Sequence, residues 1–297
     1  MNDCTGSLIN KGFQIAMWIL SLAIANVGIV RAQNAGPNGN TKEEQLQQDF
    51  TDPLTTLPQV ILRDSWSPAV FGTNVQTNQA IIRPLIPRIP PHVLLPLVQI
   101  VRPTVSLVTV PSSRGGSRTE FGDTALFDLV VSPWPPRESG LLIGIGPAFI
   151  FPTATSRSAG QGAWQAGPAF GAIYRGVPGL LIGGIVQNTT SFAYSSAHRP
   201  PQNTLSFQPV VALHLMGQWY LRSAEATWTM GWYHGTATML PLGIAVGRTI
   251  VGTERPPMSI FAGAQWMVYR QFAPVAPQTT INFGLTVAFP RIRNIWR

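Results

Sequence analysis

The segment I-N-F-G-L-T-V-A-F at 281–289 decides the fold class, because large apolar residues alternate in it with small or polar ones. Successive side chains of a β-strand point to opposite faces, so this segment places every large apolar group on one face. The segments 143–151, 204–215 and 240–247 repeat the alternation. A soluble antiparallel sheet and a membrane barrel both fit such strands.

The composition favours the barrel. Hydrophobic residues make up 45% of the chain and charged residues only 11%, under half of the roughly one quarter usual in soluble domains. Lipid would meet the apolar face of each strand, and the small or polar face would line a lumen. Spanning helices are disfavoured in the uncharged stretches 139–156 and 226–247, which contain Pro147, Pro152, Pro241 and many glycines.

We therefore predict an all-β fold, an antiparallel transmembrane β-barrel of about twelve strands within residues 57–292. Each strand reaches the ~9–11 residues needed to cross a bilayer obliquely. The predicted strands lie near 58–71, 78–88, 96–110, 122–133, 140–153, 164–175, 179–193, 204–216, 219–233, 237–249, 258–272 and 279–290.

Prolines and connectors refine this prediction. Each proline inside a strand removes a ladder hydrogen bond, so these residues should lie at bulges or near the membrane interfaces. They are Pro84, Pro103, Pro147, Pro168, Pro209 and Pro241. Connectors 111–121, 154–163 and 194–203 are long while 176–178 and 217–218 are short, which is typical of outer loops and periplasmic turns. The connector 250–257 breaks that rule.

The N-terminal region has the features of an export signal. Lys11 precedes an apolar core at 13–30, and Val30-Arg31-Ala32 ends it, so we expect a signal peptide at 1–32 cleaved after Ala32. An uncleaved anchor helix is the alternative. The chain's single cysteine, Cys4, lies in this signal, which excludes a disulfide or a Cys-ligated metal in the mature chain. Residues 33–56 are polar and are predicted to be a flexible periplasmic lead-in, and 293–297 a C-terminal tail.

The charge balance is basic. Of 20 basic and 12 acidic residues, removal of Lys11, Arg31 and Asp3 with the signal leaves 18 and 11. The arginines are scattered, so we predict no nucleic-acid partner and expect outer-membrane lipids and anionic solutes instead. Aromatic residues at segment ends suit an interfacial girdle, although ordinary core packing is the alternative. They are Trp134, Trp164, Tyr174, Trp219, Tyr220, Trp232, Tyr233 and Tyr269.

Several motifs resemble one family. The stretch G-P-A-F-I-F-P-T-A at 146–154, G-A-W-Q-A-G-P-A at 162–169 and P-L-G-I-A-V-G-R at 241–248 resemble the "MetA-pathway of phenol degradation" family of Gram-negative outer-membrane barrels. Shorter matches are F-Q-P at 207–209, W-Y-L at 219–221 and A-F-P at 288–290. The resemblance implies an outer-membrane barrel with a transport role, and no substrate-binding residues can be transferred from it.

The closing octet 282–289 also looks like the C-terminal signal that the barrel-assembly machinery reads. Its signal residues would be Asn282, Gly284, Val287 and Phe289. The eight residues that follow, 290–297, depart from the usual aromatic terminus.

Three classes of function remain open: a passive channel or transporter for small anionic or hydrophobic molecules, a barrel esterase, and a structural or adhesive barrel. An esterase would need a serine, a histidine and a carboxylate, and a hairpin about 217–218 would bring His214, Ser223 and Glu225 to the inner face. We predict that the protein is not an enzyme. His92, His198 and His234 lack ligand spacing, so we predict no metal and no cofactor. The Gly-x-Gly at 144–146 is not a phosphate loop.

A belt of charge is predicted in the lumen. A connector centred between residues 92 and 93 would pair Arg83 directly with Arg102, both facing inward. A connector centred near 116 would bring Asp128 diagonal to Arg102. Two guanidinium groups against one carboxylate would favour anions. The alternative is that these arginines brace a plugged barrel or extend to an interface.

Overall fold

The computed structural model describes residues 41–72, 75–88, 98–111, 116–132, 140–196, 198–233, 237–252, 255–271 and 276–290. Clustering of contacts divides the chain into two compact units, Met1–Glu44 and Gln45–Arg297. Of the first unit only residues 41–44, which begin helix α2 (Thr41–Thr51), are described. The predicted signal peptide, its cleavage site after Ala32 and the tail 293–297 lie outside the described residues.

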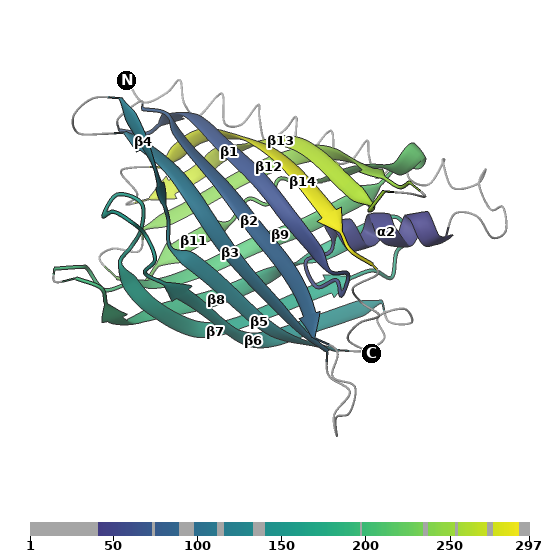
Figure 1. The fold of residues 1–297 in the computed structure, drawn as a ribbon, viewed down its shortest axis with the longest axis horizontal. Helices are drawn as coiled ribbons and strands as arrows, with labels where there is room; N and C mark the ends of the chain where they lie inside the picture. The colour runs from purple at the N-terminus through teal and green to yellow at the C-terminus, as the bar shows by residue number, and fades with distance from the viewer. Residues whose placement is uncertain are drawn as a thin grey trace. The chain divides into compact units, whose positions relative to one another are not determined.

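The second unit is a single antiparallel sheet (Figure 1). Its strands are β1 (Gln59–Val70), β2 (Thr77–Arg88), β3 (Val98–Pro111), β4 (Ser117–Phe121), β5 (Thr124–Ser132), β6 (Leu141–Phe151), β7 (Ala163–Tyr174), β8 (Leu180–Tyr194), β9 (Asn203–His214), β10 (Trp219–Ser223), β11 (Trp228–Gly231), β12 (Thr238–Ile250), β13 (Met258–Gln271) and β14 (Pro277–Ala288).

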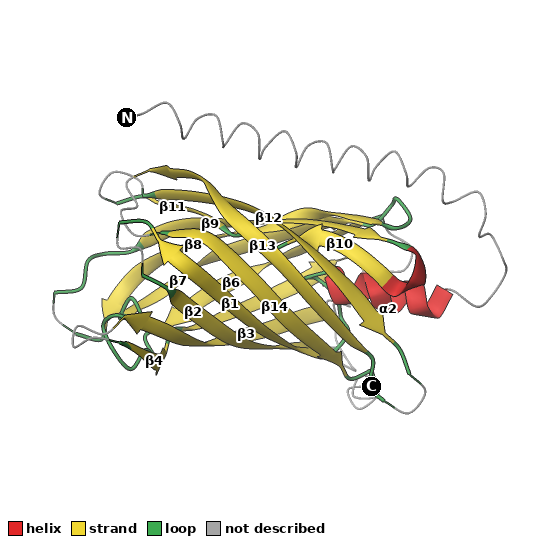
Figure 2. Cartoon of the chain, turned by 90° about the horizontal axis from the view of Figure 1, so that it is seen from above, coloured by secondary structure: helices red, strands yellow, loops and turns green. Residues whose placement is uncertain are grey.

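These strands close into a barrel of twelve wall strands (Figure 2). β4 and β5 both pair with β3 and form one interrupted strand, and β10 and β11 both lie between β9 and β12 and form another. Every other strand pairs with its neighbours in sequence, and β14 pairs with β1 to close the wall. The predicted fold class is confirmed. The predicted strand ranges agree with the observed ones with two exceptions: β4 lies in the predicted connector 111–121, and the predicted strand 219–233 is interrupted between β10 and β11.

Alternation along each strand separates an apolar outer face from the lumen. In β14, Phe283 is 54% exposed on the outside, whereas Asn282 is 1% exposed on the inside. Ile145 of β6 is likewise exposed and Ala148 buried. Large apolar side chains left exposed on so many strands need a non-aqueous surrounding, and a bilayer provides it for a closed barrel.

The predicted aromatic girdle is largely on this outer face. Trp164, Tyr174, Trp219, Trp232, Tyr233 and Tyr269 are exposed. Tyr220 is not part of it: the side chain points inward, is 1% exposed, and its hydroxyl lies 2.7 Å from Ser259 Oγ. Trp134 lies outside the described residues.

The strand prolines face one another across the sheet. Pro147 of β6 pairs with Pro168 of β7, and the flanking β5–β6 and β7–β8 ladders skip the positions beside them. Pro84 and Pro103 face each other in the same way, because the β2–β3 ladder stops at Ile82 opposite Val105 and resumes at Ile86 opposite Val101.

Two further prolines differ in their surroundings. Pro241 lies at a register shift between β12 and β13, as expected for a strand proline. Pro209 instead pairs with Gly184 in an unbroken stretch of the β8–β9 ladder.

The lumen is not empty, because residues 45–57 fold into it. Gln45–Thr51 belong to α2, which glutamate, glutamine and leucine favour and which ends before Pro53. Leu54 is 1% exposed and packs in the main core cluster with wall residues such as Leu129 and Ile173. Cβ atoms built on Gly144 and Gly171, which face each other on β6 and β7, would lie 3.0 and 3.2 Å from Leu54 Cδ2.

The structure therefore differs from the predicted flexible lead-in over residues 41–56. The segment is polar overall, but its few apolar residues, Phe50 and Leu54 among them, are buried inside the barrel. Among the described residues no helix is long and apolar enough to cross a bilayer.

Candidate functional site

The site begins at a break in the wall between β10 and β11. Tyr220 of β10 pairs with His214 of β9, whereas Trp228 of β11 pairs with Phe207, so the register slips by one residue in between. Glu225 occupies this break with a φ of 54°, a left-handed conformation that costs a non-glycine residue of the order of 1 kcal/mol. The carbonyl of Ala224, the residue before Glu225, accepts a hydrogen bond from Asn282 Nδ2 of β14 at 3.3 Å.

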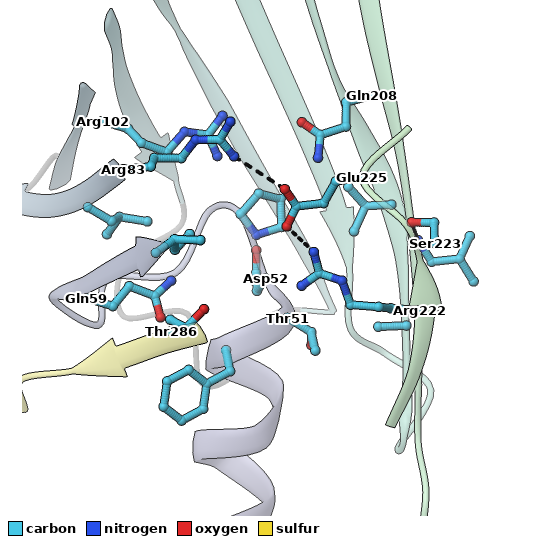
Figure 3. Close-up of a pocket in the computed structure, with 17 residues that line it drawn as sticks. Thr51, Asp52, Gln59, Arg83, Arg102, Gln208, Arg222, Ser223, Glu225 and Thr286 are labelled. Carbon is cyan, nitrogen blue, oxygen red and sulfur yellow. Dashed lines mark hydrogen bonds and ion pairs between the residues drawn. The ribbon is translucent and has the colours of Figure 1, made fainter. Parts of the chain in front are cut away.

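Glu225 meets guanidinium groups from both sides of the lumen (Figure 3). Its Oε2 lies 2.8 Å from Nη1 of Arg63 on β1 and 3.5 Å from Nη1 of Arg83 on β2. Its Oε1 accepts a hydrogen bond from Nη2 of Arg222 on β10. The four side chains are 10–15% exposed. Because Arg63 and Arg83 come from β1 and β2 and Arg222 comes from β10, their contacts with Glu225 cross the lumen and narrow it.

Arg102 of β3 adds a fourth guanidinium to the same level. The residue is 6% exposed, and its Cζ lies 4.8 Å from the ring centroid of Phe127. Arg83 has a second partner on β3, because its Nε donates a hydrogen bond to Thr104 Oγ1 at 3.0 Å. Arg63, Arg83, Arg102 and Arg222 against Glu225 give a formal balance of +3. We call these five residues the lumen cluster.

A hollow next to the cluster opens to solvent. It contains about 550 Å³ of empty space, including its opening. Arg83, Arg102, Arg222 and Glu225 line it together with Gln208 from β9, and Ile61, Leu85 and Val210 supply apolar walls. Figure 3 shows Arg83 and Arg102 side by side, with Gln208 beyond Glu225.

Ion pairs and hydrogen bonds connect residues 45–52 to the barrel wall next to this hollow. Arg175, directly after β7, contacts Asp52 and lies 3.8 Å from Asp49 Oδ1. Burial lowers the pKa of Arg175, and Asp49 opposes that shift. Thr51 Oγ1 lies 2.9 Å from His214 Nε2, and Gln47 Nε2 donates to the Trp219 carbonyl at 2.6 Å.

The structure places two of the three residues of the predicted charge belt at the same hollow in the lumen. Arg83 and Arg102 do line the same hollow, but they are not paired: Ile82 pairs with Val105, which puts Arg83 opposite Thr104. The inward placement of Asp128 is wrong. It pairs with Val101 on the outer face and accepts a hydrogen bond from Gln99 Nε2 at 2.5 Å.

The physical reason for this error lies in β5. Phe127, Leu129 and Val131 turn their apolar side chains inward, toward the core that contains Leu54. Polar Asp128 is therefore left outside, and Glu225 is the carboxylate at the arginines. The unusual feature that could have revealed Glu225 is S-A-E-A-T at 223–227, an acidic residue among small ones in a predicted strand.

The three residues considered for an esterase contact different partners. The His214 ring bonds Thr51, the Ser223 hydroxyl donates to the Pro209 carbonyl at 3.1 Å, and Glu225 binds arginines. Within the described ranges, no group of three or more His, Cys, Asp or Glu residues could hold a metal ion. His198 adopts a φ of 62° in the loop between β8 and β9, and His92 and His234 lie outside the described residues.

The proposed assembly-signal residues lie at the end of β14. Asn282 faces inward, and a Cβ atom on Gly284 would collide with the Phe261 ring. Val287 pairs with Val60 of β1, and the Phe289 backbone N–H donates to the Pro58 carbonyl at 2.8 Å. Their recognition by the assembly machinery stays a prediction.

Comparisons with known proteins show the fold. No protein-family model matches the chain, and no curated protein matches it in sequence. The crystal structure of the COG4313 outer membrane channel from Pseudomonas putida F1 superposes with a TM-score of 0.56 at 11% identity, covering 80% of this chain and 98% of that one.

Two porins are more distant. The KdgM porin gives a TM-score of 0.40 at 8% identity, covering 78% of this chain and 99% of that one. The anion-selective porin from Comamonas acidovorans gives 0.36 at 11% identity, covering 79% and 99%. At these values neither porin adds to the argument.

Proposed function

We propose that this chain is an outer-membrane channel that passes small anions. The carrying observation is the lumen cluster, in which four guanidinium groups face a single carboxylate at a narrow level of the barrel. A fixed positive charge in a passage with low-dielectric walls raises the local concentration of anions and repels cations. The fold supports the proposal, since a closed barrel with an apolar outer face suits the outer membrane.

The channel should be narrow. Residues 45–57 occupy part of the lumen, and Glu225 with its arginines crosses it. The solute would therefore be small, and transport would be passive because a bare barrel has no energy source of its own. Entry into the membrane would require export, cleavage after Ala32 and the barrel-assembly machinery. Membership of the "MetA-pathway of phenol degradation" family remains part of this proposal.

Reversal potentials test the proposal. The refolded chain is inserted into planar bilayers that separate two concentrations of KCl, and the zero-current potential is measured. We expect a potential displaced toward the equilibrium potential of chloride. Exchange of both Arg83 and Arg102 for Gln should move the potential toward that of potassium. A cation-selective wild-type chain, or no conductance in repeated insertions, would contradict the channel.

The other two classes predict different results. A structural or adhesive barrel predicts no conductance. An esterase predicts ester turnover lost on exchange of Ser223 or His214, but the separate hydrogen-bond partners of those residues do not favour it.

A further inference from the structure

One guanidinium of the lumen cluster differs from the other three. Arg63, Arg83 and Arg222 each contact Glu225, whereas Arg102 makes no hydrogen bond or ion pair with any described residue. Glu225 acts on Arg102 only through its charge at longer range, and a guanidinium that is 94% buried with no carboxylate in contact with it is costly. The Phe127 ring behind it, at 4.8 Å, holds the guanidinium in place.

Gln208 supplies a second unused donor. It lines the same hollow as Arg102 but comes from β9, on the other side of the Glu225 carboxylate in Figure 3. Its amide has no hydrogen bond to the part of the chain that the structure describes. An amide NH₂ donates readily to a carboxylate oxygen, so the hollow offers an anion donors from two walls.

Seven of the other twelve lining residues are apolar, and the five polar ones include Asp52, whose carboxylate contacts Arg175. Ile61, Leu85 and Val210 present hydrocarbon to the hollow, and Leu85 and Val210 are buried. Such walls cannot replace the hydration of an inorganic ion, but they stabilise a buried hydrocarbon by roughly 25 cal/mol per Å². Apolar walls with a few convergent polar groups are typical of a site for a small organic ligand.

We propose that this hollow binds an organic monocarboxylate with a short aliphatic body. The carboxylate would accept two parallel hydrogen bonds from the Arg102 guanidinium, whose planar fork matches it, and a third from Gln208. The aliphatic body would lie against Ile61, Leu85 and Val210. A single negative charge matches the one guanidinium of the lumen cluster that forms no direct ion pair with Glu225. The inference rests on the proposed anion channel and names its substrate class.

Binding is tested by titration calorimetry of the refolded full chain in detergent. The probes are pentanoate, pentanamide, which has the same body without the charge, and inorganic phosphate, which has charge without the body. We expect saturable binding of pentanoate at least about tenfold tighter than that of either other probe. Arg102→Gln should weaken pentanoate at least about tenfold, as expected for a charge-assisted hydrogen bond.

Arg118→Gln is the matched control. It removes the same charge from β4, where the Arg118 side chain is 52% exposed and does not line the hollow. It should bind pentanoate as the wild type does. If Arg102→Gln does not fold, as judged by unchanged mobility of unboiled and boiled samples in SDS gels, Arg102→Lys replaces it and should weaken binding severalfold. Equal affinity for phosphate and pentanoate, absence of binding to the wild type, or wild-type affinity of the Arg102 variant would overturn the proposal.

The two proposals fail separately. A chain that is anion-selective in bilayers but does not bind pentanoate retains the channel and loses the carboxylate site. A chain that binds pentanoate in detergent but never conducts retains the site and loses the channel.

Discussion

Replacing Glu225 by Gln should destabilise the barrel and increase its preference for anions. The carboxylate lies 2.8 and 3.5 Å from two guanidinium nitrogens and also contacts Arg222. At an effective dielectric constant of about 20, the pairs at 2.8 and 3.5 Å are worth roughly 6 and 5 kcal/mol before the desolvation of both partners is subtracted. Removal of one partner from a buried pair costs about 3–5 kcal/mol. The amide oxygen of Gln can keep one hydrogen bond, so we expect a loss of about 2–4 kcal/mol.

The loss is measured by urea titration of the chain in lipid vesicles, followed by tryptophan fluorescence. Glu120→Gln is the control, because Glu120 forms one ion pair in the described part of the chain, with the 52% exposed Arg118, so its removal should cost less than removal of the three pairs of Glu225. In planar bilayers Glu225→Gln raises the formal balance of the lumen cluster from +3 to +4 and should move the reversal potential further toward that of chloride. Equal stability of the Glu225 and Glu120 variants, or a potential that moves toward potassium, would refute the reasoning.

Three further predictions concern the outer face, the lumen segment and assembly. Asp64→Asn should stabilise the barrel by about 1–2 kcal/mol in the same titration, because it removes a charge that faces lipid. Asp64 pairs with exposed Phe283 near mid-strand on the lipid-facing side. A loss of stability would show that the charge of Asp64 has a partner. Leu54→Ala should cost about 2–4 kcal/mol and raise single-channel conductance, and unchanged conductance would mean that residues 45–57 do not restrict the pore. Phe289→Asp should lower surface levels more than it lowers stability in vesicles, and normal surface levels would count against the assembly signal.

The strands could be predicted from sequence because a period of two is a local property. The outer face of each wall strand presents apolar residues at alternate positions, and contact with lipid favours that pattern in each strand independently of its neighbours. Register is not local, since it depends on the conformation of the connectors. Arg83 and Arg102 were correctly placed in the lumen, but the β2–β3 register puts Thr104 opposite Arg83.

Two of the remaining errors, on Asp128 and on the lead-in, originate in residues 45–57. The rule that a barrel lumen is polar fails where this segment packs against the wall, because the inner face of β5 is apolar there. That reversal put Asp128 on the wrong side. The segment itself carries no periodicity that predicts burial, and Leu54 becomes a core residue only because Gly144 and Gly171 leave room for it. The predicted hairpin placed Glu225 on the inner face. Its contacts with the arginines depend on the break between β10 and β11, which no turn residue marks in the sequence.

The facing prolines of β6 and β7 have a mechanical consequence. Pro147 and Pro168 leave the ladder between β6 and β7 continuous from Leu141 to Ile150, while the ladders on both flanks of this hairpin are interrupted. Fewer hydrogen bonds resist separation along those flanks than within the hairpin. When the chain is pulled from a membrane by its C-terminus, β6 and β7 should therefore leave together, in one extension step and at a lower force than a hairpin with unbroken ladders on both sides.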